Sequence, residues 1–172
     1  MMSWYEVESK VKIEDYSLVE SFVKKIASLK SKEVKRDSYF ALHVNGYPHK
    51  AFRVRDNGKS FVINFKIHKK NLYSKNVVVK EEFEFVINSK AELNNFLSLC
   101  KDLGFKKWIN KRKSTTSYSL NSNKRLSIEL NNVAGLGYWM ELEYLCSKSE
   151  VFRAKKLIEK TLFFINNYGG LG

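Results

Sequence analysis

Charged side chains recur at every second position of a segment near the start of the chain. Within residues 4–13, Glu6 and Glu8 alternate with apolar residues, and Lys10 and Lys12 continue the same spacing. A period of two places alternate side chains on one face of a β-strand. Two carboxylates and two ammonium groups therefore share a face. Carboxylates are ligands for hard divalent cations, and ammonium groups bind phosphate oxygens, so this face is suited to phosphoryl chemistry.

The alternation of apolar and charged residues returns along the chain, and the repetition helps to choose between two interpretations. A single charged strand face is typical of a solvated surface. Here the Glu-x-Glu spacing occurs three times, with Arg or Lys pairs between the occurrences. A shared charged interior explains this repetition, whereas separate solvated faces do not. The further alternating segments are residues 52–55, 63–67, 79–85, 109–113 and 139–143.

Seven short motifs resemble, in their order and spacing, those of the CYTH domain. They are Glu6-Val7-Glu8-Ser9-Lys10, Asp37-Ser38-Tyr39-Phe40, Arg53-Val54-Arg55, Phe65-Lys66, Lys80-x-Glu82-x-Glu84, Leu103-Gly104-Phe105 followed by Lys111 and Lys113, and Leu136-Gly137-x-Trp139-x-Glu141-x-Glu143. The second and sixth motifs and the chain length are most similar to the class IV adenylyl cyclase branch. The resemblance spans nearly the whole chain. It implies a single CYTH domain over residues 1–172, folded as a closed antiparallel eight-stranded β-barrel, the triphosphate tunnel, with helices packed outside.

A charged barrel of this kind offers cations for a triphosphate and carboxylates for a metal. The inward-facing cationic candidates are Arg53, Arg55, Lys10, Lys66, Lys80, Lys111 and Lys113. The carboxylates would offset their mutual repulsion and could ligate Mg²⁺ or Mn²⁺; these candidates are Glu6, Glu8, Glu82, Glu84, Glu141 and Glu143. Carboxylates at positions i and i+2 project about 7 Å apart. One member of such a pair can therefore hold a metal while the other orients water or a second metal.

The resemblance also implies individual roles. Glu6, Glu8, Glu141 and Glu143 would ligate metal; Arg53, Arg55, Lys66 and Lys113 would bind phosphate; Lys10 or Lys111 would activate the attacking group. The family usually has Asp where this chain has Asn131, in Leu130-Asn131-Asn132-Val133. An amide oxygen can still ligate a metal, but without charge. The metal affinity and the presence of a second metal therefore stay open.

Three functions follow as hypotheses. The first is a class IV adenylyl cyclase, in which the ribose 3′-hydroxyl of ATP attacks the α-phosphorus to give cyclic AMP and pyrophosphate. The second is a thiamine or inorganic triphosphatase, in which water attacks the terminal phosphorus. The third is a non-catalytic binder of polyphosphate or RNA, suggested by Asn131 and the net charge of +13.

Composition limits the partners. The net charge of +13 predicts anionic partners. The basic residues are spread along the chain and no nucleic-acid-binding motif is visible, which disfavours nucleic acid as a partner.

No apolar run is long enough for a membrane span, and no export signal is recognised, so the sequence predicts a cytoplasmic protein without a membrane partner. Cys100 and Cys146 are interpreted as reduced thiols without a metal. A homodimer through an outer barrel face stays open.

The local patterns predict three helices and a series of strands, an α+β fold. Asp15 is expected to cap a helix that ends at Leu29, and Ser89 is expected to cap a helix that ends at Leu103. Ser147 and Glu150 are expected to form the capping box of a helix over residues 151–166. The polar run 114–117 is expected to be a loop or bulge, which leaves uncertain by one residue which of Lys111, Arg112 and Lys113 points inward. The expected strands are residues 4–13, 35–44, 51–55, 60–68, 77–87, 106–113, 117–120, 125–130 and 138–145.

Overall fold

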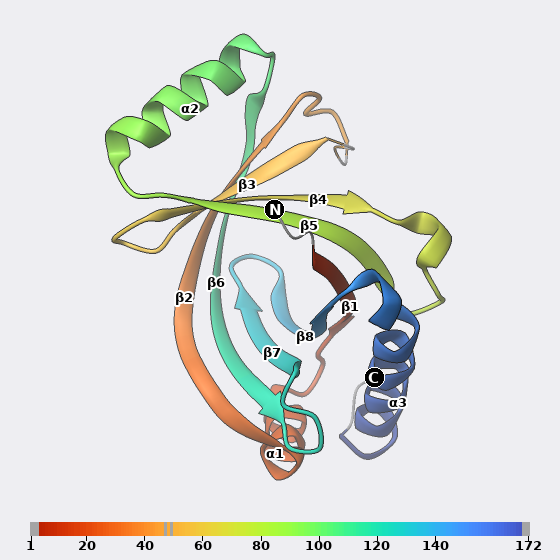
Figure 1. Cartoon of the computed structure of the whole chain (residues 1–172). Helices are drawn as coiled ribbons and strands as arrows, with labels where there is room; N and C mark the ends of the chain where they lie inside the picture. Colours follow the sequence, from red (N-terminus) through yellow and green to blue (C-terminus); the bar gives the residue numbers. More distant parts are fainter. Residues whose placement is uncertain (1–3, 47, 49, 170–172) are drawn as a thin grey trace. The chain divides into compact units, whose positions relative to one another are not determined.

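The computed structural model describes residues 4–46, 48 and 50–169, which form eight strands and three α-helices (Figure 1). The strands are β1 (Trp4–Lys12), β2 (Ala27–Ala41), β3 (Ala51–Asp56), β4 (Phe61–His68), β5 (Val78–Ile87), β6 (Lys106–Leu120), β7 (Leu126–Val133) and β8 (Gly137–Cys146). The helices are α1 (Tyr16–Ile26), α2 (Lys90–Asp102) and α3 (Val151–Gly169), with the short 3-10 helices η1 (Lys70–Leu72) and η2 (Lys148–Glu150). The predicted α+β class is confirmed.

The strands close into one antiparallel barrel in the order β1-β5-β4-β3-β2-β6-β7-β8. Closure pairs β1 with β8, which places Glu8 opposite Glu143 and Lys10 opposite Glu141. On the other side of β8, β7 places Glu129 opposite Glu141. Each of the described strands thus has a neighbour on both sides and leaves no open sheet edge. The closed barrel expected from the resemblance is confirmed.

The chain divides into two compact units. The first unit consists of the described residues of Met1–Val34, Ile67–Glu81 and Lys113–Gly172, and the second of those of Lys35–Lys66 and Glu82–Arg112. Strands β2, β4, β5 and β6 contribute residues to both units. That residues 1–172 act as a single domain stays a prediction.

In the first unit, apolar strand residues pack against helices α1 and α3. Helix α3 contacts β1, β8 and α1 (Figure 1). Val7 of β1, Ile128 of β7, Leu142 of β8 and Ile158 of α3 are fully buried in one apolar cluster. Because these strand residues alternate with Glu8, Glu129 and Glu141, the charged face of each strand is turned away from the helices.

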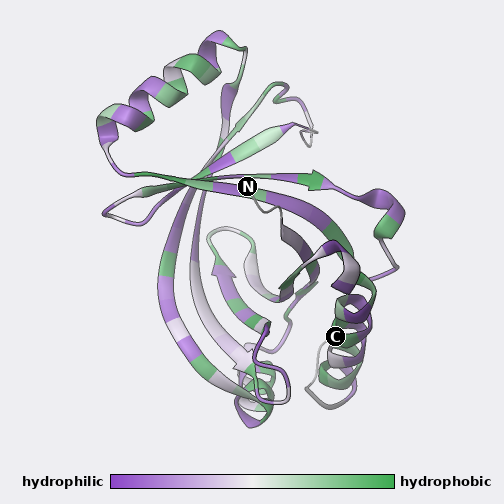
Figure 2. Ribbon diagram, in the orientation of Figure 1, coloured by the Kyte–Doolittle hydropathy of each residue, from purple (hydrophilic) through white to green (hydrophobic). Residues whose placement is uncertain are grey.

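In the second unit, helix α2 covers the apolar face of its sheet with aromatic side chains. Phe96 of α2 lies with its ring centroid 5.4 Å from that of Phe52 and 5.7 Å from that of Phe85. Phe52 also stacks on Phe40 at 5.1 Å. The hydropathy colours alternate along the strands accordingly (Figure 2). The Ser89 capping box of α2 is present as predicted. As in the first unit, the polar residues of a strand lie on the face opposite the apolar residues with which they alternate.

The first helix is shorter than the sequence predicted. The Leu18 amide donates to Asp15 Oδ1 at 3.0 Å, which confirms the cap, but α1 ends at Ile26 and strand β2 starts at Ala27 rather than residue 35. Leu29, which has helical spacing from Ile26, is 57% exposed on that strand. Pairing of β2 with β6 in the barrel thus overrides a local helical pattern.

The polar run 114–117 is neither a loop nor a bulge, so that prediction is wrong. Strand β6 is continuous from Lys106 to Leu120 and pairs residue by residue with β7. Thr115 and Ser117 are buried and hydrogen-bonded to side chains of β7. The run is polar because one face of this strand carries polar residues that are satisfied inside the barrel.

The entry to helix α3 is fixed by Glu150. Its carboxylate accepts hydrogen bonds from the Ser147 amide and from both terminal nitrogens of Arg125, at 2.7 and 3.3 Å. The expected Ser147–Glu150 capping box is present. Hydrogen bonds from Arg125 and then from Ser147 lower the pKa of Glu150 to about 2.

We expect the contribution of Glu150 to stability to be lost in acid. Because its folded pKa is depressed below 4.5, the unfolded chain binds more protons between pH 4.5 and 2, and stability falls as the pH falls through that range. The melting temperature of Glu150→Gln should be a few degrees below that of the wild type at pH 7, and the gap should narrow towards pH 2.5. A gap of equal size at both values would contradict this assignment.

Cys100 and Cys146 are both free and buried. None of the helices in the described part is long and apolar enough to cross a membrane. The last helix was expected over residues 151–166, and α3 extends to Gly169; residues 170–172 lie outside the described residues.

Candidate functional site: two clusters of buried charge

In the first unit, Glu6 and Glu8 of β1 share one lysine of β5. The Lys80 ammonium lies 3.3 Å from Glu6 Oε1 and also donates to Glu8 Oε1. Glu6 is only 1% exposed. Burial, followed by the negative charge of Glu6, raises the pKa of Glu8, although Lys80 opposes this. Burial therefore opposes the ionised form of Glu8 even with the Lys80 ammonium beside it.

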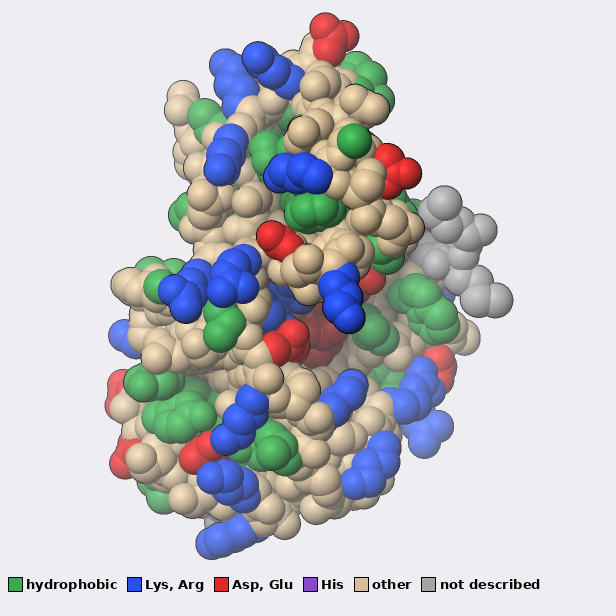
Figure 3. Space-filling view, turned by 90° about the vertical axis from the view of Figure 1, so that its left-hand side faces the viewer, with side chains coloured by type: hydrophobic (Ala, Val, Ile, Leu, Met, Phe, Trp, Pro, Cys, Tyr) green, Lys and Arg blue, Asp and Glu red, His purple; other side chains and the backbone are tan. Residues whose placement is uncertain are grey.

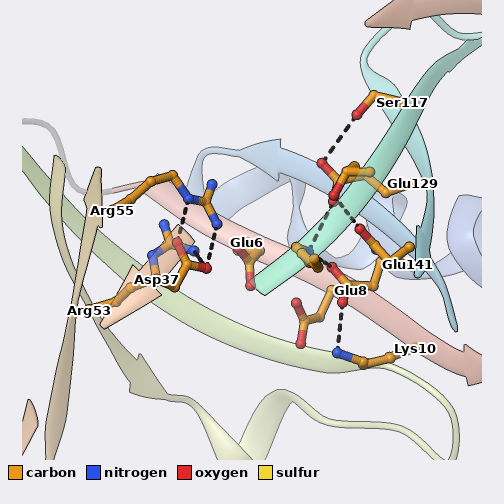
Figure 4. Close-up of polar contacts among 12 residues, drawn as sticks. Glu6, Glu8, Lys10, Asp37, Arg53, Arg55, Ser117, Glu129 and Glu141 are labelled. Atoms are coloured by element: carbon orange, nitrogen blue, oxygen red, sulfur yellow. Dashed lines mark hydrogen bonds and ion pairs between the residues drawn. The ribbon is translucent and has the colours of Figure 1, made fainter. Parts of the chain in front are cut away.

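A second group of charges connects β1, β6, β7 and β8. Lys10 Nζ donates to Glu141 Oε1 at 2.7 Å, and Lys113 Nζ donates to Glu141 Oε2 at 3.1 Å and to Glu129 Oε2 at 3.3 Å (Figure 4). Burial disfavours the ionised form of Glu141, but Lys113 and Lys10 outweigh it and lower its pKa to about 2. Glu141 is thus an ionised carboxylate held between two cations.

Next to this group, Asn131 of β7 is completely buried on the same strand face as Glu129. The Thr115 hydroxyl donates to Asn131 Oδ1 at 2.6 Å. Asn131 Nδ2 has no hydrogen-bond partner among the described residues. The hydrogen bond from Thr115 therefore orients the amide of Asn131, and the NH₂ group of that amide is a donor that no described residue uses.

In the second unit, Asp37 of β2 holds two arginines of β3. Arg55 binds Asp37 through two parallel hydrogen bonds, Nε to Oδ1 at 2.7 Å and Nη2 to Oδ2 at 2.8 Å (Figure 4). Arg53 Nη1 lies 4.0 Å from Asp37 Oδ2. Arg53 Nε is buried and has no hydrogen-bond partner in the described part of the chain. A buried guanidinium with an unused N–H group is a donor for an anionic oxygen.

The second unit contains another polar group on β4 and β5. Asn64 donates to Glu82 and, at 3.3 Å, to Glu84 Oε2. The Lys66 ammonium lies 3.4 Å from Glu82 Oε1. Asn64, which is 2% exposed, thus orients both carboxylates of the Lys80-x-Glu82-x-Glu84 motif.

The residues singled out in the sequence are therefore found in two sets. The first unit contains Glu6, Glu8, Lys10, Lys80, Lys113, Asn131, Glu141 and Glu143. The second contains Arg53, Arg55, Lys66, Glu82, Glu84 and Lys111. The sequence left open by one residue which side chain near position 113 points inward. Lys113 is buried and forms ion pairs with Glu129 and Glu141, whereas Arg112 is exposed. Glu143 lies opposite Glu8 on β8.

The predicted metal ligands do not form a preassembled centre. In residues 4–46, 48 and 50–169, no group of three or more His, Cys, Asp or Glu side chains is arranged to hold a metal ion. Instead lysines bind the carboxylates. Carboxylate oxygens are hard donors of the kind that Mg²⁺ or Mn²⁺ prefers. That Glu6, Glu8, Glu141 and Glu143 ligate such an ion stays a prediction.

Sequence reasoning missed several residues of these clusters. Glu129 was detectable, because Ser127 and Glu129 alternate with the apolar residues Leu126, Ile128 and Leu130. Asn64 and Thr115 carried no signal, because amide and hydroxyl groups are as common on solvated strand faces. Asp37 stands in a recognised motif, but only the structure places it between two arginines.

One face of the molecule carries many basic side chains. On the face in Figure 3, Lys and Arg side chains are scattered among other residues and form no continuous stripe. This face therefore lacks the concentrated basic patch that is typical of nucleic-acid-binding proteins.

Several solved structures have a similar fold. A protein from Pyrococcus horikoshii is 24% identical with a TM-score of 0.73, and the match covers 97% of this chain and 91% of that chain. A candidate adenylyl cyclase from Hippeastrum, described as having a dominant triphosphatase activity, is 19% identical with a TM-score of 0.61, covering 97% and 92%. A chain of the Schizosaccharomyces pombe Mediator head module is 7% identical with a TM-score of 0.66, covering 99% and 98%.

No family model matches the sequence, and no curated protein does. At these identities the structural likeness establishes the fold alone, and a fold can host unrelated functions. The presence of a Mediator chain among the similar structures illustrates this. The resemblance to the CYTH domain is confirmed at the level of the fold, which this chain shares with a candidate adenylyl cyclase of dominant triphosphatase activity.

Proposed function

We propose that this chain is a metal-dependent enzyme of the CYTH kind that acts on a triphosphate. One observation carries the proposal: the polar strand faces of a closed barrel bury both cations and carboxylates. Glu6 is 1%, Asp37 4% and Lys113 7% exposed. Burying this many charges is costly unless they are paired or bind a ligand. Partly buried arginines suit phosphate oxygens, and buried carboxylates suit the metal ion that accompanies a phosphate chain.

In this proposal the second unit supplies donors for phosphate. Arg55 is held by Asp37 through two hydrogen bonds, and Arg53 has a buried Nε–H group that is unused among the described residues. Lys66 adds a cation on β4. Fixed guanidinium groups lose little side-chain entropy on binding, so phosphate recognition should be strong.

The first unit supplies the carboxylates. Glu6, Glu8, Glu141 and Glu143 would hold Mg²⁺ or Mn²⁺, which when bound would neutralise charge on phosphate oxygens. Lys10 and Lys113 keep Glu141 ionised. When a ligand enters, the lysines can transfer their hydrogen bonds from carboxylates to phosphate oxygens. Lys10 is the candidate to stabilise the attacking group, with Lys111 of the second unit as the alternative.

The reaction that we place first is that of a class IV adenylyl cyclase, because the Asp37-Ser38-Tyr39-Phe40 and Leu103-Gly104-Phe105 motifs resemble that branch. The second candidate is a triphosphatase. It is favoured by the structural similarity to the Hippeastrum protein, which has a dominant triphosphatase activity.

One experiment separates these reactions. The purified protein is incubated with ATP, thiamine triphosphate or tripolyphosphate, each with Mg²⁺ or Mn²⁺, and the products are resolved by chromatography. Cyclic AMP with pyrophosphate would support the cyclase, and orthophosphate from any substrate would support a triphosphatase. Binding that persists in chelator without any product would contradict an enzyme and support a non-catalytic binder.

A further inference from the structure

We propose that Asn131 is an anion-binding residue and not a metal ligand: its amide Nδ2 donates to an oxygen of the bound phosphate chain. The inference rests on the proposed function, because it needs a triphosphate ligand. This inference differs from the expectation of the sequence analysis, in which the Asn131 amide oxygen ligates a metal in place of the usual Asp carboxylate of the family. The two roles use opposite ends of the same amide, so the contacts of that amide distinguish them.

The oxygen of the Asn131 side chain is already in use. The Thr115 hydroxyl donates to Oδ1 at 2.6 Å, and these two residues lie opposite each other on β6 and β7. Both side chains are at least 98% buried. The hydrogen bond therefore determines which end of the amide is free, and the free end is the NH₂ group.

The nitrogen of the same amide is left without a partner. Asn131 Nδ2 is a buried side-chain atom with no hydrogen-bond partner among the described residues. An unsatisfied buried donor is unfavourable, so such a group usually has an acceptor in the functional state. The amide hydrogens carry positive partial charge and would repel a metal ion, whereas a phosphate oxygen accepts from them.

The surroundings of Asn131 also suit a phosphate oxygen. Lys113 lies two residues before Thr115 on the same face of β6 and supplies an ammonium group. The carboxylate on the Asn131 face of β7 is Glu129, which Lys113 and Ser117 hold by hydrogen bonds. Positive charge and a fixed donor thus lie on adjacent strands.

The chain offers a matched pair of variants. Asn131→Asp keeps the acceptor for Thr115 and nearly the same shape, but replaces the donor by a charged acceptor. Asn132→Asp adds the same charge one residue away, on the opposite strand face, where the side chain is exposed. Asn131→Ala removes the donor without adding charge. Circular dichroism and thermal melting establish that each variant folds.

The measurement is tripolyphosphate affinity by titration calorimetry at pH 8 in the presence of chelator, where no metal contributes. Because a hydrogen bond to a charged group contributes about 1.5–3 kcal/mol, we expect Asn131→Asp to weaken binding about 10- to 100-fold. Asn131→Ala should weaken it about 10-fold, and Asn132→Asp should leave it unchanged. Mn²⁺ affinity without tripolyphosphate, measured by electron paramagnetic resonance, should be the same for Asn131→Ala and wild type.

Two results would overturn the inference while leaving the proposed function intact. One is unchanged tripolyphosphate affinity in both Asn131 variants. The other is tighter Mn²⁺ binding by Asn131→Asp together with weaker Mn²⁺ binding by Asn131→Ala, which would make residue 131 a metal ligand. If the wild type binds no tripolyphosphate with or without Mn²⁺, the proposed function fails and this inference fails with it.

Discussion

Replacing Glu8 with Gln should reduce turnover of the triphosphate at least about 100-fold while the protein stays folded. The substitution keeps the size and shape of the side chain but removes the charge that would hold a divalent cation beside Glu6. Loss of a metal-binding charge removes stabilisation of the transition state, which typically exceeds a few kcal/mol. The measurement is kcat with saturating Mn²⁺ on whichever substrate the product assay identifies.

The control for this prediction is Glu14→Gln, because Glu14 is an exposed carboxylate just beyond β1. It should have wild-type turnover. The Glu8 variant should also melt no lower than the wild type, since burial, and then the negative charge of Glu6, disfavour the ionised form of Glu8 and raise its pKa. Unchanged turnover in Glu8→Gln would exclude this residue from the metal site.

Replacing Arg55 with Ala should both weaken triphosphate binding and destabilise the fold. Arg55 makes two hydrogen bonds to Asp37, which is 4% exposed. Removing Arg55 leaves the buried Asp37 carboxylate without its two-bond partner and only the more distant Arg53 guanidinium, 4.0 Å away, nearby. Breaking a buried pair in this way costs about 3 kcal/mol. For a chain of this size we expect the melting temperature to fall by about 6–12 °C. Titration calorimetry with tripolyphosphate should show weaker binding at a temperature where the variant is folded.

A double variant separates these two effects. Adding Asp37→Asn to Arg55→Ala removes the orphaned charge, so much of the lost stability should return while binding stays weak. Arg112→Ala, an exposed arginine of the same unit, should change neither property. If the double variant melts as low as the single one, the Asp37–Arg55 pair is not the cause of the destabilisation.

The strand faces were predictable from sequence because every second residue of a strand lies on the same face, and one face of most strands is buried. Alternation at Glu6, Glu8, Glu141 and Glu143 identified the charged faces, and the structure places apolar neighbours such as Val7 and Leu142 on the opposite, helix-covered side. Where a strand segment lacks an apolar face, the sequence shows no alternation of apolar and polar residues, and the strand cannot be recognised from it. Strand β2 is exposed at residues 28–34 and has no apolar alternation there, so its start was misplaced.

The partners of individual side chains could not be predicted, because register and hydrogen bonding depend on which strands become neighbours. Asn131 is the clearest example. From the sequence it is an amide in place of a carboxylate, and its oxygen is the obvious ligand. Only the pairing of β6 with β7 brings Thr115 to that oxygen and reverses the expected role of the side chain.

The pairing of β1 with β8 has a consequence for how the protein folds. Lys10 and Glu141, which this pairing brings together, are separated by 131 positions in the sequence. Contacts of such long range form slowly, because much chain entropy is lost before they contribute stability. During synthesis, β1 emerges first and must wait for β8 before it gains this neighbour. The charged group formed by Lys10, Lys113, Glu129 and Glu141 is therefore completed late. A nascent chain that lacks β8 lacks Glu141 and cannot assemble this group.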